Sequence, residues 1–186
     1  SYTYNYDRKS KLTINYYIRA ERKDYVIVKY IITFLAGAVV VTIPLVCNFV
    51  LTMMKLPLIT PQASTGTYPL NGSDMFADIF YTRPMLYILI YFAVIFVYSG
   101  LMAVLPMGIS YFTDNTFVQL STPFIGNILV YCICNVRSMY RYVPLRFIDP
   151  AQDGGFTDAA SAFAIILLLL IFNIVMAVRG MRDETL

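Results

Sequence analysis

The sequence predicts an all-α membrane protein, a polytopic bundle of four membrane-spanning helices with both termini in the cytoplasm. Hydrophobic residues make up 59% of the 186 residues and charged residues 13%, against about 45–50% and about 25% in soluble domains. The apolar residues are gathered in long blocks, and Lys and Arg are concentrated in the flanks of these blocks. Together these observations decide the fold class before any motif is considered.

Four blocks are long enough to cross the hydrocarbon core of a bilayer, which takes about 20 helical residues at 1.5 Å each. They cover approximately residues 25–54, 85–110, 117–136 and 159–178. The first block contains a single charged residue, Lys29, near its start, and the fourth block is the most apolar. These blocks make residues 25–186 the transmembrane domain and leave residues 1–24 as an amphipathic cytoplasmic segment.

The third span is the weakest of the four, because polar residues and a proline dilute it: Gln119, Ser121, Thr122, Pro123 and Asn127. A link of about six residues, 111–116, separates it from the second span. Such a short link makes the two spans antiparallel neighbours.

Orientation follows from the basic residues that flank the spans. The two terminal flanks hold nine Lys and Arg residues, whereas the loops 55–84 and 137–158 hold five. This bias places both termini inside and the two loops outside. The first loop is rich in Pro, Gly, Ser and Thr and predicts irregular structure. The second alternates aromatic and apolar residues with Arg, a pattern suited to the outer membrane interface.

Composition also limits the chemistry that the chain can perform. Histidine is absent, which removes the commonest general base and metal ligand. The three cysteines lie in apolar blocks and lack partners at zinc spacing, so neither a metal site nor a cofactor is expected. A net charge of +3 argues against nucleic acid as a partner. No phosphate-binding loop of the G-x-x-x-x-G-K-[ST] type is present, so ATP hydrolysis is not expected of this chain.

Four amides fall within the spans and are the candidates for either helix packing or a transport pathway: Asn48, Asn127, Asn135 and Asn173. A buried amide needs hydrogen-bond partners, so these side chains are expected to face other helices or a wet cavity. The middle of each span lacks Asp, Glu, Lys and Arg. This argues against an ion-coupled pump, which uses an ionisable relay there.

The segment that precedes the first span carries a dense run of mixed charge: Arg19, Glu21, Arg22, Lys23 and Asp24. One interpretation is a juxtamembrane anchor whose basic residues are attracted to anionic lipid. The other is a docking element for a soluble protein. The acidic residues favour the second interpretation slightly, because an anionic membrane surface would repel them.

Residues 17–30, with the sequence YIRAERKDYVIVKY, resemble the cytoplasmic segment between the second and third spans of ABC-2 type transporter permeases. The resemblance is carried by Arg22, Lys23, Tyr25 and Lys29 at the entrance to a long span. It implies a coupling helix that docks on a separate ATPase subunit. Tyr17 and Ile18 would then be packing contacts, and Arg19, Glu21 and Arg22 polar contacts.

The same resemblance implies that the chain is the C-terminal portion of a six-span permease in the cell membrane. Such a permease would work as a homodimer or heterodimer with another permease chain, embedded in membrane lipid. The lack of a soluble substrate-binding domain favours an exporter. The alternative is an accessory or scaffolding membrane subunit without transport activity.

A membrane enzyme is the least favoured alternative. Asp149, Asp153 and Asp158 lie near the outer face, but their spacing matches no known cation-binding loop.

Overall fold

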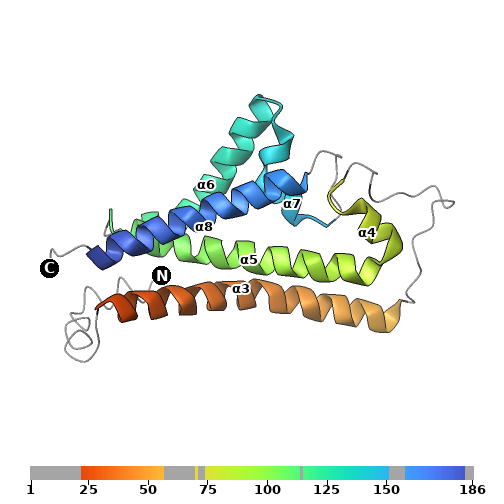
Figure 1. The fold of residues 1–186 in the computed structure, drawn as a ribbon, viewed down its shortest axis with the longest axis horizontal. Helices are drawn as coiled ribbons and strands as arrows, with labels where there is room; N and C mark the ends of the chain where they lie inside the picture. The colour runs from red at the N-terminus through yellow and green to blue at the C-terminus, as the bar shows by residue number, and fades with distance from the viewer. Residues whose placement is uncertain (1–21, 57–69, 71–73, 114, 151–157, 183–186) are drawn as a thin grey trace.

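A computed structural model describes residues 22–56, 70, 74–113, 115–150 and 158–182 of the chain (Figure 1). Every regular element within these ranges is a helix. In chain order the elements are α3 (Arg22–Lys55), α4 (Ala77–Thr82), α5 (Pro84–Ile109), α6 (Thr116–Val136), the 3₁₀ helix η2 (Tyr140–Tyr142), α7 (Pro144–Ile148) and α8 (Ala159–Arg182).

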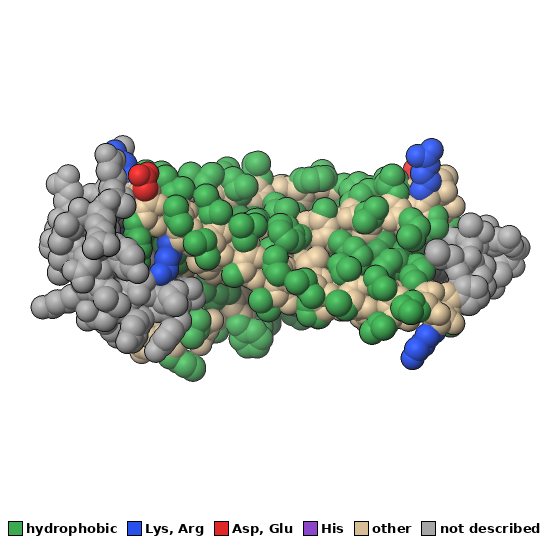
Figure 2. All heavy atoms as spheres, turned by 90° about the horizontal axis from the view of Figure 1, so that it is seen from below, with side chains coloured by type: hydrophobic (Ala, Val, Ile, Leu, Met, Phe, Trp, Pro, Cys, Tyr) green, Lys and Arg blue, Asp and Glu red, His purple; other side chains and the backbone are tan. Residues whose placement is uncertain are grey.

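Four of these helices, α3, α5, α6 and α8, are long and apolar enough to cross a membrane. The prediction of an all-helical chain with four helices long and apolar enough to span a membrane is therefore confirmed for the described part of the chain, and the cytoplasmic placement of the termini stays a prediction. Figure 2 shows a long face covered by hydrophobic side chains, with the Lys, Arg and acidic side chains near its two ends. This distribution suits a helix bundle whose middle lies in hydrocarbon and whose ends reach the interfaces.

The helix α5 is the central element of the bundle. It lies between α3 and α8 (Figure 1) and also contacts α4, α6 and α7. Its buried residues lie on several faces and include Tyr87, Tyr98, Val104 and Met107. A helix that is hydrophobic all round, as the second predicted span is, belongs in such a buried position.

Small residues allow α3 and α8 to approach α5 closely. A Cβ atom on Gly37 of α3 would overlap the side chain of Ala103. One on Gly100 of α5 would lie 2.5 Å from the ring of Phe34. On the other side of α5, a Cβ on Gly108 would lie 3.0 Å from Met176 Cβ of α8. Close backbone approach at small residues is a main source of helix association in membranes, where the hydrophobic effect does not drive it.

The helix α6 is inclined to the other three long helices (Figure 1). Asn115 caps its start by accepting a hydrogen bond from Phe117 N at 3.0 Å, and the Gln119 side chain donates to Thr113 O at 2.6 Å. Only Gln119 and Cys134 are buried along its length. The short link does place α6 beside the end of α5, but the inclination leaves most of α6 exposed. The weakest predicted span is thus also a loosely packed one.

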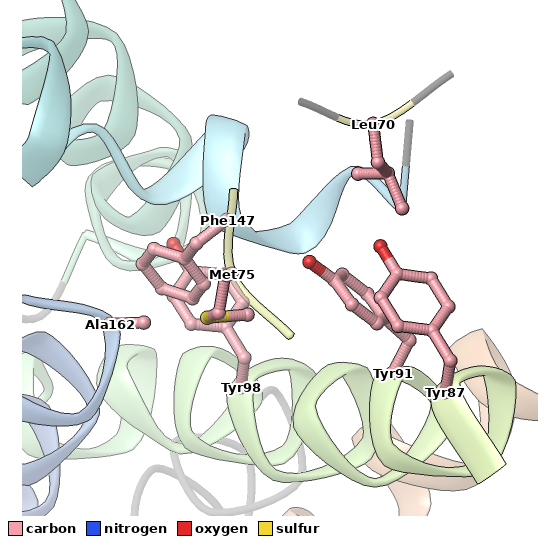
Figure 3. Close-up of a cluster of buried hydrophobic side chains, with 7 residues drawn as sticks. All are labelled: Leu70, Met75, Tyr87, Tyr91, Tyr98, Phe147 and Ala162. Carbon is pink, nitrogen blue, oxygen red and sulfur yellow. The ribbon is translucent and has the colours of Figure 1, made fainter. Parts of the chain in front are cut away.

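The segments outside the spans fold back onto α5, from its beginning to its middle. Phe147 of α7 is 1% exposed and meets Tyr98 edge to face, with 5.6 Å between ring centroids (Figure 3). Tyr87 donates a hydrogen bond to Pro150 O at 2.8 Å. The described part of loop 55–84 includes α4, where the sequence predicted irregular structure. The described part of loop 137–158 forms η2 and α7 and packs on α5, α6 and α8.

Candidate functional site

The predicted docking residues fall at the edge of the described part of the chain. Tyr17, Ile18, Arg19 and Glu21 lie outside the described residues. Arg22 is the first residue of α3, and α3 continues from it without a break to Lys55. The charged run at Lys23 and Asp24 therefore belongs to the same helix as the first span.

A lateral groove lies between α3, α5 and α6, with Ile148 of α7 at its edge. Its volume is about 800 Å³, and it is shallow and widely open on one side. Apolar and small residues form most of the wall. The polar side chains that line it are Thr33 of α3, Tyr98 and Ser99 of α5 and Asn127 of α6. None of the described residues that line the groove is charged.

A hydrogen bond between Tyr98 and Asn127 joins α5 to α6 within this groove. The Tyr98 hydroxyl donates to Asn127 Oδ1 at 2.7 Å. The amide nitrogen of Asn127 donates in turn to Pro123 O at 3.0 Å and contacts Met102 Sδ at 3.7 Å. The predicted pathway candidate Asn127 is therefore in the groove, and its amide is held in one orientation by these three partners.

Asn48 lies on the same side of α3 as the groove wall. It follows the lining residue Val41 by two helical turns, and residues at this spacing share a helix face. Its side chain is exposed, and its backbone carbonyl accepts a hydrogen bond from Thr52 Oγ1 at 2.8 Å.

Asn173 lies on the opposite side of α5 and belongs to a different site. It lines a smaller cavity of about 330 Å³ between α3, α5 and α8. Its amide nitrogen donates to Leu169 O at 2.9 Å and to Leu101 O at 3.4 Å. Its Oδ1 is buried without a hydrogen-bond partner among the described residues. The geometry is that of a helix-packing contact between α8 and α5.

Asn135 contributes to neither cavity. It lies in the last turn of α6, where its backbone carbonyl accepts hydrogen bonds from the amides of Arg137 and Ser138. The four predicted amides are thus divided: Asn127 lines the groove, Asn48 lies on α3 beyond the groove, Asn173 packs α8 on α5, and Asn135 lies at the end of α6.

Reasoning from the sequence missed the three hydroxyl groups of the groove, those of Thr33, Tyr98 and Ser99. The adjacent polar pair Tyr98 and Ser99 inside an apolar span was an available signal. Among the described residues there is no group of His, Cys, Asp or Glu side chains that could hold a metal ion.

The groove can therefore bind and orient a ligand by hydrogen bonds and apolar contacts. The described residues that line it include no acid, base or thiol. No family model matches the chain, and no curated protein or solved structure is significantly similar to it.

Proposed function

We propose that this chain is the membrane permease subunit of an ATP-driven transporter of the ABC-2 type, an exporter in the cell membrane. The observation that carries the proposal is the lateral groove, whose mostly apolar wall includes the hydrogen-bonded pair Tyr98 and Asn127. Polar groups at membrane depth are retained where they face a pathway or another protein. The groove is the feature of the described chain that fits the wall of such a pathway.

The open side of the groove supports a second membrane chain as partner. Lining residues such as Ile32, Val40 and Leu120 remain exposed in the isolated chain. A second copy or a related permease chain would close the groove on that side and shield its polar groups from lipid. In this proposal each chain supplies one wall of the pathway.

The continuity of α3 supports coupling to a separate ATPase. Thirty-four residues form one helix, which is about 50 Å long at 1.5 Å per residue. A displacement of its start near Arg22 would move the groove wall at Thr33, Gly37 and Val41, because a continuous helix moves largely as one body. Docking through Tyr17, Ile18, Arg19, Glu21 and Arg22 would place the ATPase at this end, in the cytoplasm.

The test replaces Arg19 and Arg22 with Glu in the full chain, and measures co-purification with the product of a neighbouring ATPase gene. We expect the variant to lose the ATPase, because charge reversal repels acidic contacts that the native residues attract. Lys55→Glu is the matched control, since it reverses a charge at the opposite end of α3 and should leave association unchanged. Undiminished association of the Arg19/Arg22 variant would refute the docking site.

The accessory-subunit alternative shares one observation with the permease. The helices α3 and α6 expose long apolar faces, among them Val40 at 71% and Phe124 at 69% exposure, which other membrane helices could cover. An accessory subunit would co-purify with membrane partners but with no ATPase, and substitutions of Tyr98 and Asn127 would leave transport by its partners intact.

A further inference from the structure

We propose that the lateral groove binds a neutral membrane lipid through hydroxyl groups on the lipid headgroup. The inference rests on the proposed function, in which the groove is the wall of a transport pathway, and it names the class of substrate. It follows from which hydrogen-bonding atoms of the groove are already engaged within the chain and which are left for a ligand.

The polar hydrogens of the groove are already donated within the chain. Thr33 Oγ1 donates to Lys29 O at 2.8 Å, and Ser99 Oγ donates to Phe96 O at 3.2 Å. Tyr98 donates to Asn127, and the amide nitrogen of Asn127 donates to Pro123 O and Met102 Sδ. Each hydroxyl oxygen retains lone pairs, and Asn127 Oδ1 retains one. The side chains therefore present acceptors to a ligand and no free donor.

Two prolines add to this excess of acceptors. Pro44 and Pro106 lie inside α3 and α5, and neither has an N–H group. The backbone carbonyls four residues earlier, those of Val40 and Met102, thus lack their usual helical donor. Both Val40 and Met102 line the groove. A ligand in the groove must accordingly supply hydrogen-bond donors.

The lack of charge in the groove and the apolar character of its wall further limit the chemical class of the ligand. The described lining includes no charged side chain, so an ionic headgroup would lose its hydration without gaining a counter-charge. Ammonium donors are thereby disfavoured, and hydroxyl donors remain. The apolar remainder of the wall suits an acyl chain, which would lie between this wall and the wall that the second chain supplies in the proposed transporter.

Binding can be measured with the full chain in nanodiscs by photolabelling with a diazirine derivative of 1-monooleoylglycerol. Unlabelled 1-monooleoylglycerol should compete at about tenfold lower bilayer mole fraction than methyl oleate, which lacks hydroxyl donors, or oleate, which is charged. A factor of ten corresponds to about two modest hydrogen bonds. Equal competition by methyl oleate or oleate would overturn the inference.

Variants locate the site. The double variant Thr33→Val/Ser99→Ala removes two acceptors. It should raise the mole fraction of unlabelled 1-monooleoylglycerol needed to compete with the photolabel about tenfold. Thr52→Val is the matched control, because Thr52 makes the same bond to a carbonyl four residues earlier but does not line the groove. In Pro106→Ala, the alanine N–H can donate a helical hydrogen bond to Met102 O, and alanine favours helix. Met102 O is then no longer a free acceptor, so this variant should also bind the lipid more weakly. Unchanged binding in both groove variants would overturn the assignment.

This assay requires neither ATPase nor transport, so it separates the inference from the proposed function. Selective binding without ATPase association would retain the lipid site and refute the transporter. ATPase association together with unselective binding would retain the transporter and refute the lipid class.

Discussion

Gly37 of α3 and Ala103 of α5 lie so close that a Cβ atom on Gly37 would overlap the Ala103 side chain. The contact lies at the level of the lateral groove, which Gly37 and Ala103 both line. Glycine at this position lets the two helix backbones approach, and the groove depends on their spacing.

Gly37→Ala should destabilise the bundle by about 1–3 kcal/mol, because the added methyl forces α3 away from α5 in a packed interface. The free energy of unfolding can be measured by SDS titration in mixed micelles. Gly126→Ala in α6 is the matched control, since a Cβ there meets nothing within 4 Å. Alanine favours helix over glycine by about 0.5–1 kcal/mol, so this control should be neutral or stabilising. Equal effects of the two substitutions would contradict the close approach.

The Tyr98–Asn127 hydrogen bond should couple α5 to α6 energetically. A double-mutant cycle with Tyr98→Phe and Asn127→Leu should give a coupling energy of about 0.5–1.5 kcal/mol in the free energy of unfolding. Tyr131→Phe, at an exposed position of α6, should change stability by less than about 0.5 kcal/mol. A coupling energy of zero would mean that the two side chains do not meet in the membrane.

Asn173 and Asn127 should respond differently to replacement by leucine. In Asn173→Leu the chain loses one short and one long hydrogen bond but also loses a buried unpaired oxygen. The adjacent cavity of about 330 Å³ accommodates the larger side chain. We expect a change in unfolding free energy within about 1 kcal/mol, because apolar replacement of an imperfectly paired group is nearly neutral. A melting temperature lowered as much by Asn173→Leu as by Asn127→Leu would contradict this assignment.

The predicted orientation can be tested with cysteine substitutions in a background from which Cys47, Cys132 and Cys134 have been removed. Arg83→Cys, before α5, should react with a membrane-impermeant maleimide on intact cells. Phe112→Cys, beyond the other end of α5, should react only after permeabilisation. Both positions are exposed, so the difference reports the side of the membrane. The reverse pattern would place both termini outside.

The number, type and approximate bounds of the long helices could be predicted from the sequence. The reason is that a helix needs about 20 consecutive apolar residues to span a bilayer, and such stretches can be recognised directly in the sequence. The prediction failed where local signals are weak. The Pro- and Gly-rich loop 55–84 contains α4, a helix of only six residues that lacks a side-chain cap. This helix packs on α5, a long-range contact that the local sequence does not reveal.

The sequence alone predicted four helices long and apolar enough to cross a membrane, which the described residues contain, and identified Asn48, Asn127, Asn135 and Asn173 as polar residues within them. Only the tertiary structure decided which of these amides share a site. Helix periodicity fixes the face on which a residue lies, but not which helix that face meets. That choice depends on long-range packing, such as the fit of Gly37 to Ala103 and of Gly108 to Met176. The same packing brings Tyr98 to Asn127, across 29 residues of sequence, and creates the groove between them.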